Sequence, residues 1–217
     1  MPRTCRCCWR STTSRFAVYC PAHQSRNRRH GHPEQLAITK DVLKPKLRTI
    51  RRRIAKNSVS PLWDCLEARW GVILEHSKGV LASKAPMDRH YRTAARELAK
   101  LGTSVEADTI VETALAMVVL QSFEPQRFKS DKAFRVQLSR RLRGLTDLNA
   151  GLWYDHTTGK MKRAYRELSP KAAVIIAGII TQAFGPAGLR IAQLERMDHE
   201  ERNYGVSTVR RALEALD

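Results

Sequence analysis

Two pairs of candidate metal ligands near the start of the chain constrain its fold more than any other feature. Cys5 and Cys8 are two residues apart, Cys20 and His23 repeat that spacing, and eleven residues separate the two pairs. Tetrahedral zinc sites are often built in this way, because each pair can chelate from a tight turn or from the first turn of a helix. The spacing predicts zinc as a cofactor, with Cys5, Cys8, Cys20 and His23 as its ligands.

Other ligand sets stay open on the sequence alone. Cys7 could replace Cys5 or Cys8, although a two-residue gap closes a chelate more easily, and His30 and His32 are alternative ligands. The competing interpretation makes these cysteines free thiols in a disordered basic tail, but a free cysteine is usually buried and this segment is too polar to bury four. The fifth cysteine, Cys65, stands in an apolar helical pattern and is expected in the core.

The second ligand pair is expected at the start of a short basic helix. Pro21 suits the first helical position, since its missing N–H would have no partner there, and Gly31 suits the left-handed residue beyond the helix end. Three arginines of this helix are predicted to contact nucleic acid: Arg26, Arg28 and Arg29. Arg26 and Arg29 are the ones expected to reach base edges.

The segment from Tyr19 to Pro33 resembles a short motif of phage and mobile-element proteins, in which an aromatic-Cys-x-x-His unit precedes a basic run and Gly-x-Pro. Some of those proteins are His-Asn-His endonucleases and others bind DNA. The resemblance covers about 30 residues. It implies a treble-clef-like zinc module over residues 1–33, with Cys20 and His23 as ligands beside two of the three early cysteines. The His-rich catalytic unit of the nuclease members has no counterpart after Pro33, so nuclease activity is not implied.

The positive charge of the chain is concentrated near its start. Of 39 Lys and Arg residues, 15 lie in the first 56 positions, where Glu34 and Asp41 are the only acids. Such a density attracts phosphate backbones, so nucleic acid is the predicted partner, with DNA favoured over RNA. The apolar runs 114–120 and 172–184 are shorter than the ~20 residues of a membrane-spanning helix, so no membrane partner is expected. The start of the chain is basic without the apolar core of a signal peptide, which predicts a bacterial cytoplasmic, nucleoid-associated protein.

Residues 34–58 are expected to form basic linker helices, the second of them beginning at Pro45. An apolar stripe of Leu47, Ile50 and Ile54 would cover one face. The cations on the remaining circumference are predicted to contact phosphate: Lys46, Arg48, Arg51, Arg52, Arg53 and Lys56. The alternative is a solvated charged face, but such faces generally mix the two signs.

Residues 59–217 are expected to form an α-helical domain, so the predicted fold class is mainly α, a small zinc-binding module followed by a multi-helix body. Helix boundaries are expected at Gly102, at a capping box from Thr103 to Glu106, at Ser130 and at Gly185-Pro186. The segment 152–166 is the exception, because its Asp and Gly turn residues between short alternating arms predict a β-hairpin.

The end of the chain offers a second candidate for DNA binding. Residues 205–216 resemble the turn and recognition helix of a helix-turn-helix, with Arg210 and Arg211 facing outward. The turn is two residues shorter than in the common pattern. A terminal helix that packs through Val209 and Leu213 is the alternative.

No catalytic residue is predicted from the sequence. Gly-rich phosphate loops, Gly-x-Ser-x-Gly elbows and zincin helices do not occur in it, and a zinc ion with four protein ligands has no open position for water. The leading hypothesis is a DNA-binding accessory or regulatory protein of a phage or mobile element, acting as a homo-oligomer or with a mobile-element protein. The alternatives are a nuclease or recombinase subunit with unrecognised catalytic residues and an RNA-binding assembly module.

Overall fold

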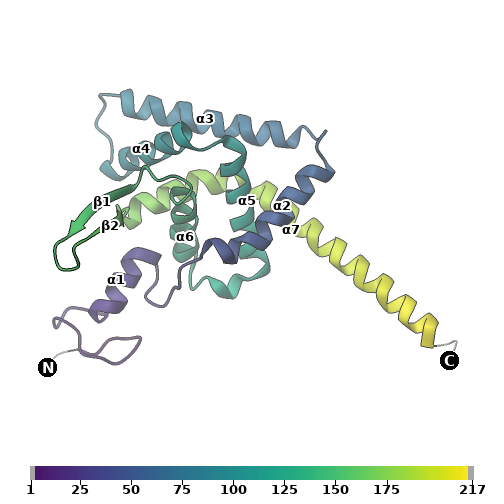
Figure 1. Cartoon of the computed structure of the whole chain (residues 1–217), viewed down its shortest axis with the longest axis horizontal. Coiled ribbons are helices and arrows are strands. Elements are labelled where there is room, and N and C mark those ends of the chain that lie inside the picture. The colour runs from purple at the N-terminus through teal and green to yellow at the C-terminus, as the bar shows by residue number, and fades with distance from the viewer. Residues whose placement is uncertain (1–2, 215–217) are drawn as a thin grey trace.

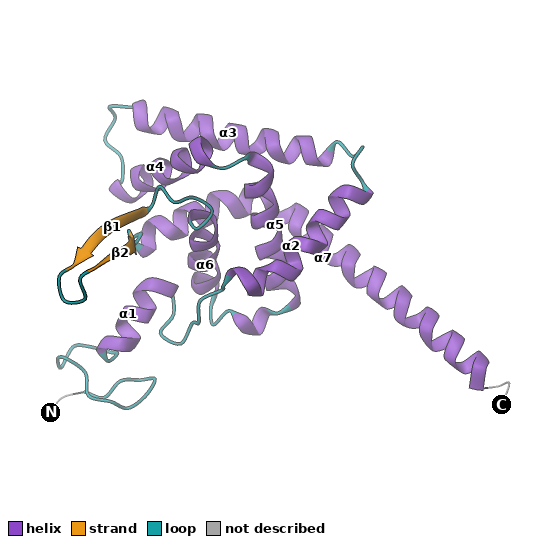
Figure 2. Cartoon of the chain, viewed as in Figure 1, coloured by secondary structure: helices purple, strands orange, loops and turns teal. Residues whose placement is uncertain are grey.

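Helices make up most of the protein, and the Cys/His-rich segment lies at one end of them (Figures 1 and 2). The computed structural model describes residues 3–214, without the side chains at 163, 165 and 205–214. This architecture confirms the predicted fold class. The elements are, in order, α1 (Pro21–His30), α2 (Lys40–Lys56), α3 (Leu62–Ala82), α4 (Arg89–Ser104), α5 (Ala107–Phe123), the short 3-10 helix η1 (Pro125–Arg127), α6 (Asp131–Arg143), β1 (Ala150–Asp155), β2 (Lys160–Tyr165) and α7 (Pro170–Glu214).

Helix α5 forms the centre of the core, because it is apolar around its whole circumference. Every residue from 114 to 120 is buried, and helices α2, α3, α6 and α7 all pack against it. The first half of α7 supplies the opposite wall through Ile176, Ile180 and Phe184. The two helices approach closely at Gly188, where an added Cβ would lie 2.8 Å from the Cβ of Val118. A larger residue there would force α5 and α7 apart.

Helix α7 is continuous over 45 residues, and its C-terminal part extends away from the bundle (Figure 1). The predicted break at Gly185-Pro186 is therefore wrong, and so is the predicted turn at Gly205. An interior proline costs about 3 kcal/mol, but burial of Phe184 on one side and of Ile191 on the other holds the helix across Pro186. Arg210 and Arg211 lie on this helix, and their side chains are outside the described part of the structure.

The described part of α7 is also long and apolar enough to cross a membrane, with a mean hydropathy of 1.7 in its most apolar window. This corrects the expectation that no stretch of the chain would reach that length. The buried part of this stretch, with Ile176, Ile180 and Phe184, belongs to the core that α7 forms with α5 and α6. A core helix gives the same signal as a membrane-spanning one, so the feature carries no membrane assignment.

Helix α2 is a single helix, and not the two short helices that were predicted. The Thr39 side chain accepts a hydrogen bond from the N–H of Val42 and so caps the helix start. Pro45 removes only one backbone hydrogen bond near that end. The buried side chains of Leu43 and Ile50 join the same core as the rest of the bundle.

Carboxylates of the bundle already engage four of the six cations that were predicted on α2 to contact phosphate. Arg53 is the most enclosed of them, with 13 % of its side chain exposed between Glu195 at 2.5 Å and Asp198 at 2.6 Å. The other three pairs are Lys46 with Glu124, Arg51 with Glu112, and Arg52 with Glu195. Arg48 and Lys56 are exposed. Much of the positive charge of α2 thus serves to attach it to α5 and α7.

Several helix boundaries differ from those predicted. Helix α4 continues through Gly102, where an added Cβ would overlap the side chain of Leu74, so the glycine serves the close packing of α3 against α4. Glu106 precedes α5 without a side-chain cap, so no capping box forms. The cap at Ser130 is confirmed, because its hydroxyl accepts from the N–H of Ala133. Cys65 is exposed on α3, which contradicts its expected place in the core.

The β-hairpin is confirmed, with Ala150 opposite Tyr165 and Asp155 opposite Lys160. Its turn is organised by Asp155, which accepts hydrogen bonds from the N–H of Thr157 and the hydroxyl of Thr158 and also pairs with Lys162. The hydrogen bond to Lys162 is the largest influence on the carboxyl of Asp155 and lowers its pKa. Asp155 therefore stabilises the turn.

Arg53→Ala is expected to lower the free energy of unfolding by about 1–3 kcal/mol, because Glu195 would stay largely buried with only the exposed Arg52 to pair with it, and Asp198 would lose its contact with Arg53. The matched control is Arg48→Ala, which removes an exposed arginine from the same helix and should change stability by less than about 0.5 kcal/mol. Urea unfolding of the metal-loaded protein measures both. Equal losses in the two variants would contradict the role given to Arg53.

Candidate metal centre

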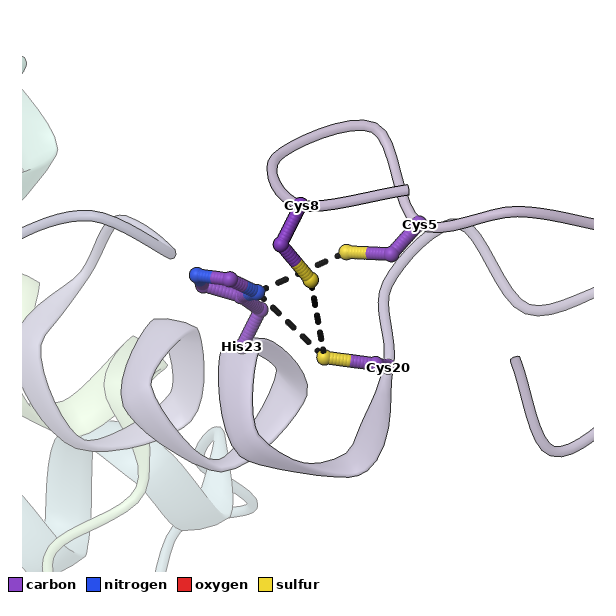
Figure 3. A group of neighbouring side chains, drawn as sticks. All are labelled: Cys5, Cys8, Cys20 and His23. Atoms are coloured by element: carbon purple, nitrogen blue, oxygen red, sulfur yellow. Dashed lines mark hydrogen bonds between the residues drawn. The ribbon is translucent and has the colours of Figure 1, made fainter. Parts of the chain in front are cut away.

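The first pair of candidate ligands comes from a tight turn that backbone hydrogen bonds close. Thr4 and Ser11 form an antiparallel bridge across its open end, and the N–H of Cys5 donates to the carbonyl of Arg10 at 2.8 Å. The N–H of Trp9 in turn donates to the carbonyl of Cys5 at 2.9 Å, and Trp9 has a φ of 59°. Left-handed backbone at Trp9 turns the chain directly after Cys8, and the side chains of Cys5 and Cys8 face the same point (Figure 3).

The second pair comes from the start of α1, as the sequence predicts. Cys20 has extended backbone and occupies the cap position, Pro21 begins the helix, and His23 follows within the first turn. The helix ends at Gly31, whose φ of 86° is left-handed. Arg28, Arg29 and His30 occupy the last turn, where positive charge favours the carbonyl end of a helix.

The four side chains converge on one point (Figure 3). The sulfurs of Cys5, Cys8 and Cys20 and the Nδ1 atom of His23 all lie within 4.8 Å of one another. The Nδ1 atom is 3.5 Å from the sulfur of Cys5 and 3.3 Å from that of Cys20, and the sulfurs of Cys8 and Cys20 are 3.7 Å apart. Tetrahedral zinc with bonds of about 2.3 Å to sulfur and about 2.0 Å to nitrogen needs separations of about 3.8 Å and about 3.5 Å. The donor set and its spacing therefore fit a four-coordinate metal ion.

The surroundings of Cys5 favour the thiolate, the form that binds metal. Burial of its sulfur raises the pKa, but backbone hydrogen bonds from Cys20, Cys7 and Cys8 outweigh burial and lower the pKa to about 6. Burial and the charge of Glu34 instead raise the pKa of Cys7, whose sulfur is not in the cluster. A backbone hydrogen bond lowers the pKa of Cys8, but burial and the neighbouring Cys20 and Cys5 outweigh it and raise that pKa. Position and not pKa therefore distinguishes Cys7 from the ligands.

The two alternative histidine ligands have other roles. Nδ1 of His30 lies 3.0 Å from the amide nitrogen of Gln137, and Nδ1 of His32 accepts a hydrogen bond from the N–H of Glu34. Among the described residues the structure brings together the four that the sequence predicts, Cys5, Cys8, Cys20 and His23.

Helix α1 is joined closely to the bundle at its C-terminal end. An added Cβ at Gly31 would lie 2.9 Å from the Cα of Ala133, so only glycine allows this approach to α6. The buried side chain of Gln137 contacts His30 and also accepts the N–H of Ile38 at 3.0 Å, which fixes both ends of the loop between α1 and α2. Arg140 donates to the carbonyl of Arg29. The metal centre is therefore held in a defined position relative to α6.

The arginines predicted on α1 have different surroundings. Arg26 is exposed, whereas Arg28 and Arg29 both pair with Glu167, at 3.2 Å and 2.5 Å. Sequence reasoning missed Glu167 and Gln137, because each lies more than a hundred residues from its partner in α1. The run Arg140-Arg141-x-Arg143 was the one available signal, and the structure places it beside α1.

Comparisons of the chain with protein-family models, with curated proteins and with solved structures found no match. The resemblance of residues 19–33 to the phage and mobile-element motif therefore stays a prediction from the sequence, and the ligand cluster supports the metal site alone. The function has to be argued from the geometry.

Purified protein is expected to bind one zinc ion per chain, because four ligands converge on one point. Cys20→Ser combined with His23→Ala should remove most of the metal, since two of four bonds are lost. Cys7→Ser is the matched control and should keep the full content. Elemental analysis gives the zinc content of all three proteins. Zinc retained by the double variant, or lost from the Cys7→Ser control, would contradict the ligand set.

Trp9→Gly is expected to tighten metal binding and Trp9→Val to weaken it, because φ is left-handed at a residue whose side chain is 77 % exposed. Left-handed backbone costs a non-glycine residue about 1–2 kcal/mol, and metal binding includes the folding of the turn. The two variants should differ by roughly tenfold in zinc affinity. Competition with a chromophoric chelator gives the affinities. Equal values would show that the turn stores no such strain.

Proposed function

We propose that this protein is a zinc-stabilised nucleic-acid-binding protein that binds duplex DNA mainly through its phosphates. We further propose that it acts as an accessory or regulatory protein of a phage or mobile element, in the bacterial cytoplasm at the nucleoid. The observation that carries the proposal is the Cys/His cluster, which lies inside the most basic segment of the chain and fixes the basic helix α1.

Zinc is the metal that this donor set favours. Three thiolates and one imidazole match structural zinc sites, and such closed sites contribute folding energy to segments with little core of their own. Helix α1 buries none of its residues, so it depends on the ligands and on its contact with α6. A turn followed by a ligand-bearing helix supports a treble-clef-like module, in agreement with the motif resemblance.

A binding role is better supported than a catalytic one. A histidine and an arginine three residues apart, His199 and Arg202, could suggest recombinase chemistry, and Asp155 could suggest a metal-dependent nuclease. Each has a local partner: His199 contacts Asn203, Arg202 donates to the carbonyl of Asp198, and Asp155 organises the hairpin turn. Four protein ligands also leave the metal no open position for an activated water.

The ion pairs of α2 change where phosphate contacts are expected. An arginine that already faces a carboxylate must give up that interaction to bind phosphate, so Arg51, Arg52 and Arg53 are less available than their charge suggests. On α1 and α2, the phosphate contacts are therefore expected from the exposed side chains of Arg26, Arg48 and Lys56. Partnership with a second copy or with a mobile-element protein stays a prediction.

Zinc-loaded protein is expected to bind random-sequence duplex DNA with an affinity that falls steeply with salt. The log–log slope should be about −0.9 per phosphate contacted, measured by fluorescence anisotropy between about 50 and 200 mM salt. The double variant Cys20→Ser, His23→Ala should bind at least about tenfold more weakly, because α1 loses its fixed position, whereas Cys7→Ser should bind normally. A structured RNA that outcompetes the duplex would favour the RNA-binding alternative. A slope near zero would contradict the proposal.

A further inference from the structure

A groove lies between α1, the start of α2, the end of α6 and the base of the hairpin. Its volume is about 490 Å³, and two carboxylates, Asp147 and Glu167, line it. Six cations line it as well: Arg29, Lys40, Arg140, Arg141, Arg143 and Arg166. In Figure 2, α1 and the hairpin lie on the same side of α6, although the sequence places the four elements in separate segments.

Part of this positive charge has a structural role. Arg29 pairs with Glu167, and Arg143 pairs with Glu97 at 2.6 Å. Arg140 donates to the carbonyl of Arg29, at the end of α1. These contacts join α1 to the segment after the hairpin and to α6, join α6 to α4, and account for half of the cations in the groove. They do not account for Lys40, Arg141 and Arg166.

Two buried donors in the groove have no acceptor in the described part of the chain. They are Nε of Arg141 and Nδ2 of Asn149. Asn149 is 5 % exposed, and its Oδ1 lies 3.5 Å from Nζ of Lys100, which leaves the amide nitrogen for another partner. A buried unsatisfied donor costs about 1–3 kcal/mol, so two of them in one cationic groove indicate an acceptor that comes from outside the chain.

The charges that line the groove also favour an anion there. Burial lowers the pKa of Arg141, and burial together with the charge of Arg141 lowers that of Arg140. Like charges are thus held close together in a partly desolvated place. An anion in the groove would relieve that repulsion and would accept the two unsatisfied hydrogen bonds.

The groove continues beyond the size of a single anion. A neighbouring cavity of about 370 Å³ shares Arg143, Arg166 and Glu167 with it. That cavity adds three cations of α4, Arg89, Arg96 and Lys100. The basic surface therefore runs from α1 past the base of the hairpin to α4, a shape that suits a chain of phosphates. The hairpin that rises from it carries the exposed rings of Trp153 and Tyr154.

We propose that this groove binds successive phosphates of a nucleic-acid backbone, with Lys40, Arg141 and Arg166 as the contacting cations and Asn149 as a neutral donor. The site rests on the proposed function for the identity of the polyanion. The main phosphate contact would then lie at the junction of α1, α6 and the hairpin and not along α2. A structural role for these cations alone would leave the two buried donors unexplained.

The test uses the zinc-loaded full chain with Lys40, Arg141 and Arg166 all changed to Gln. The matched control is Arg135→Gln, which removes an exposed arginine of α6 that does not line the groove. For duplex DNA, the triple variant should show a log–log salt slope smaller in magnitude by about two to three units and an affinity reduced about tenfold or more. The control should behave as the unchanged protein.

A second measurement separates failure of the groove from failure of the function. At constant ionic strength, pyrophosphate should raise the melting temperature of the unchanged protein and of Arg135→Gln, but not that of the triple variant. DNA binding with an unchanged slope in the triple variant would overturn the groove and leave the proposed function standing. Protection by pyrophosphate that needs Arg141, without binding to any nucleic acid, would overturn the nucleic-acid occupant and the proposed function together.

Discussion

The convergence of three cysteines and one histidine on a single point is the constraint on which the basic end of the molecule depends. The turn that carries Cys5 and Cys8 is closed by a few backbone hydrogen bonds, and α1 buries none of its residues. Apolar burial therefore contributes little to this segment, and a metal ion held by the four ligands would supply free energy that orders it. Loss of the metal would release both the turn and the start of α1.

The second constraint is the attachment of α1 to α6. Gly31 allows the two helices to approach, and Gln137 holds the loop that follows. This attachment brings the basic end of α1 beside the basic end of α6, against the electrostatic preference of two cationic segments to separate. Glu167 offsets part of the repulsion. The positive charge that Glu167 does not offset stays concentrated there, and an external polyanion would neutralise it.

The parts of the structure that sequence reasoning predicted all have local signals. The ligand cluster, which spans 18 positions, is the widest of them, and α1 with its Pro21 and Gly31, the Ser130 cap and the hairpin turn each depend on residues still closer in sequence. Two of the failures have non-local causes: the ion pairs of Arg53 depend on residues about 140 positions away, and packing on α5 carries α7 across Pro186. The exposure of Cys65 has a local cause, because the neighbouring Leu66 takes the buried position. The groove combines four segments, so no single stretch of sequence could reveal it.

Hydrogen–deuterium exchange of the zinc-loaded protein, with and without duplex DNA, tests the central claim most directly, because it locates the contact surface without any substitution. A phosphate-binding surface at the junction of α1, α6 and the hairpin predicts slower exchange in peptides that cover residues 26–31, 140–150 and 164–168. Peptides that cover residues 45–56 of α2, beyond Lys40, should change little in comparison. Protection confined to residues 45–56, or no protection anywhere under conditions in which the DNA is bound, would contradict this account.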